Sequence, residues 1–172
     1  MDYKEFTEEK TDLSKLSTEY IHKEHYEIIH KETVILCHDV FIHCEDKGIL
    51  LVKRLNHPAK NIHWPIGGRI LRGIPTEESL RRKVLDECNL TLTDIRYLGT
   101  ARTFFKEDPF GHGKGTDTLN LIYFANGVGE VSLNNLHSDP FFINKENYQN
   151  TRHELPEYIQ TFLDEIIDKY FK

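Results

Sequence analysis

Residues 64–90 read WPIGGRILRGIPTEESLRRKVLDECNL, and this stretch decides the fold. The pair Gly67-Gly68 predicts a tight turn that leads into a polar loop, because glycine adopts backbone conformations closed to other residues. A helix is predicted over residues 76–88, with Thr76 as its N-cap. Glu77 and Glu78 fall in its first turn, where the helix dipole favours acids. The stretch is therefore a loop followed by a short helix.

The charged residues of this helix fall on one side. At about 100° per residue, Lys83, Asp86 and Glu87 lie within an arc of about 100°. Four apolar residues occupy the broadly opposite side: Leu80, Val84, Leu85 and Cys88. One face can then pack on a sheet while the other meets a ligand. A surface helix whose charges only face water gives the same pattern, so the helix by itself leaves both interpretations open.

The rest of the chain predicts a mixed α+β fold with helices packed on a curved sheet. Helices are expected over 16–29 and 156–171, from apolar residues at helical spacing. Strands are expected over 33–42, 49–53, 95–105 and 119–125. Polar or Gly/Pro-rich loops are expected over 55–62, 106–116 and 132–140. We expect one domain, residues 1–172, with residues 1–17 as a loose N-terminal arm.

The composition is that of a soluble globular protein. Of the 172 residues, 38% are hydrophobic and 29% are charged, and the formal net charge of −6 gives no general attraction to nucleic acid or to anionic membranes. Three cysteines give no disulfide framework, and no segment has the pattern of a signal peptide or a membrane span. We expect a cytoplasmic protein. An anionic substrate would need a local basic site or a metal.

The spacing of Gly67-Gly68, Arg82, Asp86 and Glu87 resembles the Nudix box, a loop–helix that holds Mg²⁺ against a diphosphate. The departures from that pattern are Ile74 and Lys83, where the family has acids, and Asn89, where it has a late glycine. The ammonium group of Lys83 would repel a second Mg²⁺. It could pair with Glu87 one turn later or touch a substrate diphosphate. These changes favour one metal or none.

Beyond the box, residues 26–142 resemble one Nudix branch, the GDP-mannose mannosyl hydrolases. The matching pieces are TVILCHDVFI, LLVKRLNHPAKNIHWPIGGRI, RRKVLDE, the GKGTD loop and the NNLHSDP loop. The resemblance implies a Nudix fold and a Mg²⁺-dependent hydrolase, with Mn²⁺ as another possible metal. It also implies that water attacks the sugar C1 of a nucleotide sugar, releasing free sugar and nucleoside diphosphate. Family members often form homodimers through N-terminal segments, and the apolar stripe of Tyr20, Tyr26 and Ile29 fits that.

The resemblance carries roles to named positions. Gly67 and Glu87 would bind the metal through a carbonyl and a carboxylate, and Asp86 is an extra possible ligand. Diphosphate contacts, which also stabilise the leaving nucleoside diphosphate, would come from three arginines: Arg54, Arg69 and Arg82. Lys83 could touch the diphosphate as well, but this follows from its charge and not from the resemblance.

The sugar-side roles come from the same resemblance. Asp39 would hydrogen-bond the sugar or stabilise its developing positive charge, and His137 would be the general base. By themselves, a loop histidine is usually solvated, and a buried aspartate is either satisfied structurally or functional.

One position disagrees with this branch. A side-chain metal ligand normally precedes the catalytic histidine, but Leu136 cannot coordinate. Either Asp86 replaces the lost oxygen or metal affinity is poor. Two other functions remain open: a conventional Nudix pyrophosphohydrolase, in which water attacks phosphorus, and a catalytically inactive domain that binds nucleotide.

Overall fold

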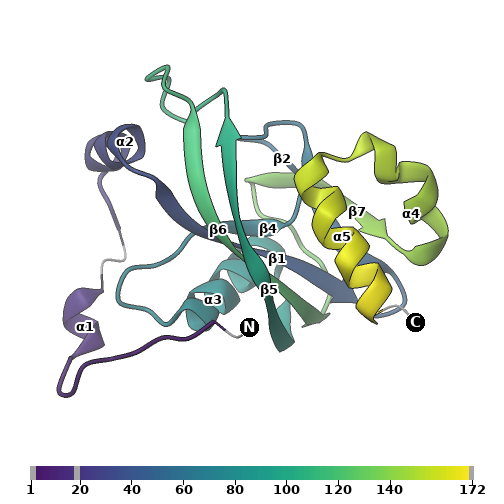
Figure 1. The fold of residues 1–172 in the computed structure, drawn as a ribbon, viewed down its shortest axis with the longest axis horizontal. Helices are drawn as coiled ribbons and strands as arrows, with labels where there is room; N and C mark the ends of the chain where they lie inside the picture. Colours follow the sequence, from purple (N-terminus) through teal and green to yellow (C-terminus); the bar gives the residue numbers. More distant parts are fainter. Residues whose placement is uncertain (1–2, 18–19, 171–172) are drawn as a thin grey trace.

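The computed structural model describes residues 3–17 and 20–170. Within them, seven strands form one curved mixed sheet with helices on both faces (Figure 1). The main path of the sheet is β3-β2-β1-β6-β5, while β4 pairs with β1 and β7 pairs with β2. The predicted α+β class and the sheet between helices are confirmed.

The centre of the sheet is β1 (Ile35–Cys44), which is buried along nearly its whole length. It runs parallel to β6 (Thr116–Val128) and antiparallel to β2 (Gly48–Arg54). On the far side of β6 lies β5 (Thr91–Phe105), in antiparallel register. The four predicted strands are present. The strand predicted over 33–42 is shifted, since β1 begins and ends two residues later, and the other three extend beyond their predicted bounds because hydrogen-bonded partners continue the pairing.

Two predicted loops are wrong in part. Gly67 and Gly68 do not form a turn but lie in β4 (Ile66–Arg69), whose backbone pairs with β1. The predicted loop over 132–140 ends early, because β7 (His137–Ile143) starts at His137. Pro140 suggested a loop, but β7 pairs only with β2, and an edge strand tolerates proline. The two-residue strand β3 (His63–Trp64) was also not predicted.

Two helices cover opposite faces of the sheet. Leu80, Val84 and Cys88 of α3 (Thr76–Cys88) pack on one face with Val40 and Ile42. The other face, which includes Phe41 from the same strand, packs against α5 (Glu157–Tyr170) through Ile159, Phe162, Leu163 and Ile166. Neighbouring residues of β1 thus belong to different hydrophobic clusters, because side chains alternate across a strand. Leu85, predicted to face the sheet, is 56% exposed instead.

The helix predicted over 16–29 is not continuous. The structure has α1 (Leu13–Leu16) and α2 (Lys23–Glu32), and residues 18–19 of the prediction lie outside the described residues. The C-terminal helix is confirmed to Tyr170, and residue 171 also lies outside them. Two further helices precede α5, namely α4 (Lys145–Thr151) and the short η1 (Arg152–Glu154). None of the described helices is long and apolar enough to cross a membrane.

The start of α3 is fixed by the N-terminal arm. Thr76 was expected as the N-cap, but it is the first helical residue, and Pro75 at the cap position has no side-chain acceptor. The carboxylate of Glu5 takes that role, since it accepts hydrogen bonds from the Thr76 backbone N–H (3.1 and 3.2 Å) and hydroxyl (2.6 Å). Arg72 also donates to the Leu16 carbonyl (2.7 Å). The arm is therefore bound to the helix that carries the candidate site.

Candidate active site

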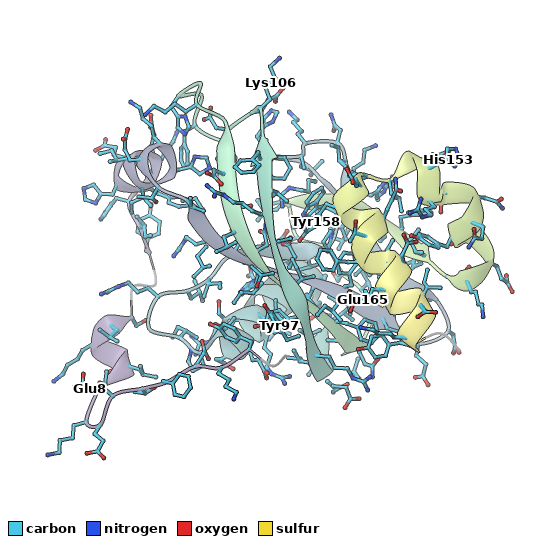
Figure 2. The ribbon with its side chains drawn as sticks, in the orientation of Figure 1. Glu8, Tyr97, Lys106, His153, Tyr158 and Glu165 are labelled. Carbon is cyan, nitrogen blue, oxygen red and sulfur yellow. The ribbon has the colours of Figure 1, made fainter. Side chains whose placement is uncertain are left out.

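Asp39 is a buried acid on the central strand. Its register partner on β4 is Gly67, and a Cβ added at Gly67 would overlap the Asp39 carboxylate. On α5, the Tyr158 hydroxyl donates a 2.6 Å hydrogen bond to Asp39 Oδ2, and Figure 2 shows Tyr158 between that helix and the sheet. Burial raises the pKa of Asp39 to about 6, although hydrogen bonds from Tyr158 and Trp64 and the charge of Arg54 oppose the shift. The absence of a side chain at Gly67 thus leaves room for the Asp39 carboxyl group.

Asp39 lines a pocket of about 260 Å³, close to the lower limit of about 300 Å³ for typical ligand sites. The pocket is lined by aromatic and by neutral polar residues. The aromatic residues are Tyr26, Trp64, Phe105 and Phe110; the polar ones are Thr103, Thr116, Thr118 and Asn120. Aromatic faces and neutral hydrogen-bonding groups suit a base or a sugar ring.

Two arginines bring positive charge to this pocket. Arg54 is the last residue of β2, and its Nε donates to the Pro58 carbonyl at 2.8 Å. Arg69 is the last residue of β4, and its guanidinium lies 5.5 Å from the centre of the Tyr26 ring. Both side chains line the pocket together with Asp39. Guanidinium groups match phosphate oxygens in forked geometry, so this charge suits an anionic ligand.

His137 lies beside the pocket and is buried, not solvated as a loop histidine would be. As the first residue of β7 it is the register partner of Arg54. Its Nε2 is 3.9 Å from Glu87 Oε2, which is too long for a hydrogen bond. Burial, with the charges of Arg54 and Lys83, lowers the pKa of His137 to about 4. The imidazole is therefore neutral at pH 7.

Glu87 comes from the last turn of α3 and is buried at the same place. Its Oε1 is 3.2 Å from Lys83 Nζ, while Oε2 has no hydrogen-bond partner among the described residues. Burial raises the pKa of Glu87, and the ammonium of Lys83 opposes that shift. The segment after β6 brings His137 close, because the Asn134 backbone N–H donates to the Glu87 carbonyl at 3.0 Å. A lysine, an acid and a neutral histidine therefore meet here.

Two predicted site residues lie elsewhere on α3. Arg82 is exposed, and its Nε is 2.7 Å from Glu78 Oε1 on the helix surface. Asp86 is also exposed, whereas Glu87 is buried. The structure thus brings Asp39, Arg54 and Arg69 into one pocket and places Lys83, Glu87 and His137 beside it. It leaves Arg82 and Asp86 outside. Asn89 has φ 60° at the helix end, so it adopts the left-handed conformation that a glycine there would supply.

The predicted side-chain ligands, Asp86 and Glu87, do not fit a divalent cation. Among residues 3–17 and 20–170, no group of three or more His, Cys, Asp and Glu side chains could hold a metal. Of the predicted ligands, Asp86 faces solvent, and Glu87 has one oxygen in contact with the Lys83 ammonium. A divalent ion prefers several oxygen ligands and is repelled by a fixed positive charge.

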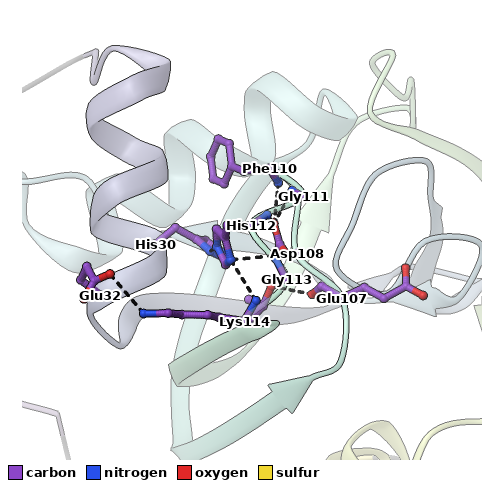
Figure 3. A network of polar contacts seen from close by, with 10 residues as sticks. His30, Glu32, Glu107, Asp108, Phe110, Gly111, His112, Gly113 and Lys114 are labelled. Atoms are coloured by element: carbon purple, nitrogen blue, oxygen red, sulfur yellow. Dashed lines mark hydrogen bonds and ion pairs between the residues drawn. The ribbon is translucent and has the colours of Figure 1, made fainter.

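A loop after β5 forms one wall of the pocket and is tightly organised (Figure 3). Asp108 accepts hydrogen bonds from the backbone N–H groups of Phe110, Gly111, His112 and Gly113, at 2.5 to 3.1 Å. These bonds lower the pKa of Asp108 to about 2, although desolvation opposes them. His112 Nε2 lies 2.9 Å from His30 Nδ1 on α2, which joins the loop to that helix.

The fold is similar to solved structures of low sequence identity. A MutT protein from Methanosarcina mazei aligns with a TM-score of 0.61 and 18% identity, over 82% of this chain and 99% of that one. The NUDIX domain of Shewanella oneidensis NrtR, complexed with ADP ribose, aligns with a TM-score of 0.58 and 16% identity, over 88% and 100%. The chain has the Nudix fold. No protein-family model and no curated protein matches its sequence.

A third structure with the Nudix fold is a bifunctional NMN adenylyltransferase/ADP ribose pyrophosphatase from Francisella tularensis, complexed with AMP and a Mn ion. It aligns with a TM-score of 0.60 and 16% identity, over 86% of this chain and 47% of that one. In the present Nudix fold, β4 and α3 hold the segment that resembles the Nudix box, and the pocket opens beside β4.

Sequence reasoning missed several residues of the site. Tyr158 hydrogen-bonds Asp39, and Tyr26, His30 and Phe110 line the pocket. Tyr158 is 119 residues from Asp39 in the chain, so no local pattern links the two. The Gly-rich run after Asp108 is a signal that could have been used, because an aspartate followed by glycines often caps a turn through its side chain.

Proposed function

We propose that this chain hydrolyses a nucleotide derivative that contains a diphosphate, such as a nucleotide sugar, in the pocket lined by Asp39, Arg54 and Arg69. The observation that carries the proposal is that these three residues share one pocket with aromatic and neutral polar residues. The arginines would hold the diphosphate, and the aromatic and neutral polar residues of the pocket would hold the base and the sugar. A GDP-hexose is the predicted substrate, from the resemblance to the mannosyl hydrolases.

In the proposed reaction, water attacks the sugar C1. The C1–O bond breaks, its electron pair leaves with the nucleoside diphosphate, and the water proton passes to a base. Arg54 and Arg69 would stabilise the charge that develops on the leaving diphosphate. The products are a free sugar and a nucleoside diphosphate.

Asp39 and His137 are the two groups that could accept the proton. The geometry favours Asp39, because it lines the pocket, whereas His137 is not among the described residues that do so. A carboxyl group whose pKa is about 6 is also a better base at neutral pH than an imidazole whose pKa is about 4. We therefore assign proton transfer to Asp39, with His137 as the alternative base.

A product assay in oxygen-18-labelled water tests this proposal. The purified chain is incubated with GDP-mannose, other nucleotide sugars and ADP-ribose, and the products are resolved by ion exchange and mass spectrometry. We expect nucleoside diphosphate and labelled free sugar, lost in Asp39→Asn and in Arg54→Ala and retained in Lys169→Ala. Nucleoside monophosphate and a labelled phosphate would instead show attack at phosphorus, as in a conventional pyrophosphohydrolase.

A nucleotide-binding domain without turnover is the second candidate function. It is favoured by the contact between Lys83 and Glu87, which disturbs the predicted metal site. Calorimetry with GDP and ADP-ribose would show binding, while the product assay shows no cleavage of any substrate. Running both assays with Mg²⁺, Mn²⁺ and EDTA tests the predicted metal dependence. The homodimer and the cytoplasmic location also remain predictions, and sedimentation velocity tests the former.

A further inference from the structure

The ammonium group of Lys83 lies where α3 meets β4. Its Nζ is 3.5 Å from the point that a Cβ on Gly68 would occupy, and Gly68 lines the pocket. Gly68 has φ +142°, a conformation that residues with side chains rarely adopt. No Cβ therefore stands between its backbone and the lysine. The Lys83 side chain is 28% exposed. A positive charge is therefore held against the backbone that borders the ligand space.

Lys83 is paired with a buried acid, which distinguishes it from an ordinary surface ion pair. Its partner Glu87 has a side chain only 4% exposed. The comparable pair of Lys169 and Glu165 on α5 is also four residues apart, but there the two side chains are 55% and 31% exposed. Removing one member of a buried pair leaves an uncompensated charge, whereas a surface pair contributes little.

The charge of Lys83 acts on the whole neighbourhood of Glu87. Together with burial and Arg54, it helps to hold the pKa of His137 at about 4. It also opposes the rise that burial causes in the pKa of Cys37, as do Arg54 and Arg69. Arg54 is also close to Glu87, because it is the register partner of His137, whose Nε2 is 3.9 Å from Glu87 Oε2. A divalent ion on Glu87 would meet this charge, and its repulsion from one ammonium is twice that of a monovalent ion at the same distance.

We infer that Lys83 is a fixed cation of this site, which keeps divalent metals off Glu87 and adds its positive charge to that of Arg54 and Arg69 at the Gly68 border of the pocket. The inference rests on the proposed function in one respect, namely that a diphosphate occupies the pocket beside Gly68. It follows that ligand binding does not depend on a divalent metal. The same positive charge also keeps Glu87 compensated when no ligand is present.

Metal binding by the free protein tests the first half. Mn²⁺ is titrated into the full chain, and free Mn²⁺ is measured by electron paramagnetic resonance. We expect no stoichiometric site in the wild type and a gain in affinity of at least about tenfold in Lys83→Glu, where a carboxylate replaces the ammonium. Lys169→Glu makes the same charge change on α5 and should gain nothing. A single Mn²⁺ site in the wild type that Glu87→Gln abolishes would overturn the inference.

Binding of inorganic pyrophosphate tests the second half, and it needs no catalysis. Calorimetry should give the same affinity in Mg²⁺ and in EDTA, a loss of about tenfold in Lys83→Gln and recovery in Lys83→Arg. Circular dichroism verifies that each variant is folded, and recovery by arginine separates lost charge from lost packing. Binding that vanishes in EDTA, or no binding of pyrophosphate in either buffer, contradicts the inference. If pyrophosphate binds but no nucleotide derivative is cleaved, only the proposed hydrolysis fails.

Discussion

Gly67 and Asp39 face each other across the β4–β1 pair, and the Asp39 carboxylate occupies the space that a side chain at Gly67 would fill. Gly67 is not in the left-handed backbone conformation, because its φ is not positive. Its lack of a side chain is required by the Asp39 carboxylate and by the His38 backbone carbonyl, not by a turn. A side chain at Gly67 and the Asp39 carboxylate therefore cannot occupy this space together.

Gly67→Ala should displace the Asp39 side chain and destabilise the protein. Inserting a methyl group into packed structure costs about 1–3 kcal/mol, and here the methyl also disturbs the bond from Tyr158. Urea denaturation measures the loss. The matched control is Gly99→Ala, because a Cβ at Gly99 meets nothing within 4 Å. Equal stability losses in the two variants would show that Asp39 does not fill the space beside Gly67.

Asp39→Asn should change how stability depends on pH. The folded pKa of Asp39 is raised from 3.8 to about 6, so its ionisation disfavours the folded state as pH rises through that range. The free energy of unfolding of the variant, minus that of the wild type, should increase by up to about 3 kcal/mol between pH 4 and pH 7.

His38 and His137 also titrate in this pH range. The prediction therefore uses the difference in the free energy of unfolding between variant and wild type, which isolates the contribution of Asp39. Burial lowers the pKa values of both histidines to about 4, so their contribution is present above pH 6.5 and is lost as pH falls. These histidines are common to variant and wild type and cancel. A difference that is flat with pH would show that the Asp39 carboxyl is not shifted.

Asp108→Ala should open the loop that forms one wall of the pocket. The substitution removes the acceptor for four backbone N–H groups, including those of Gly111 and Gly113. Hydrogen exchange at residues 109–115 should become faster, while that of β1 stays unchanged. Glu107→Ala is the neighbouring control, because its side chain is 61% exposed and pairs with His57, not with the backbone of this loop. Unchanged exchange in Asp108→Ala would mean that contacts with α2 are enough to hold the loop.

Glu5→Ala should weaken the start of α3. Loss of a capping acceptor costs about 1 kcal/mol, and Pro75 offers no replacement. Thermal unfolding should show a lower midpoint than in the wild type, and Glu8→Ala, an exposed acid of the same arm, should not change it. If both variants melt alike, the arm does not stabilise the helix.

The sequence predicts the regular elements of this fold well where one periodic pattern dominates. The bounds of α3 agree with the prediction, since its apolar residues recur at helical spacing between Pro75 and Asn89. The sequence did not predict β7, because Ser138-Asp139-Pro140 has the composition of a turn. Only the pairing with β2 makes this segment a strand. Local sequence does not contain that partner.

The candidate site is predicted less completely than the fold. Asp39, Arg54 and Arg69 were named from the sequence, and the structure places them in one pocket. Arg82 was named with them, but helix spacing alone does not say which charged side chain turns towards the sheet, and Glu78 holds it at the surface. Tyr158 could not be found, because packing of α5 on the sheet brings it to Asp39.

The bond between Glu5 and Thr76 joins two residues 71 positions apart, and it has a practical consequence for anyone who produces this protein. Residues 3–17 form a polar arm that looks dispensable, so a shortened version of the protein would naturally omit them. Such a trimmed protein would lose the acid that starts α3, the helix that holds both Lys83 and Glu87. Affinity tags are therefore better placed after α5. Low activity in a truncated protein would first indicate the loss of this helix cap, not a defect in catalysis.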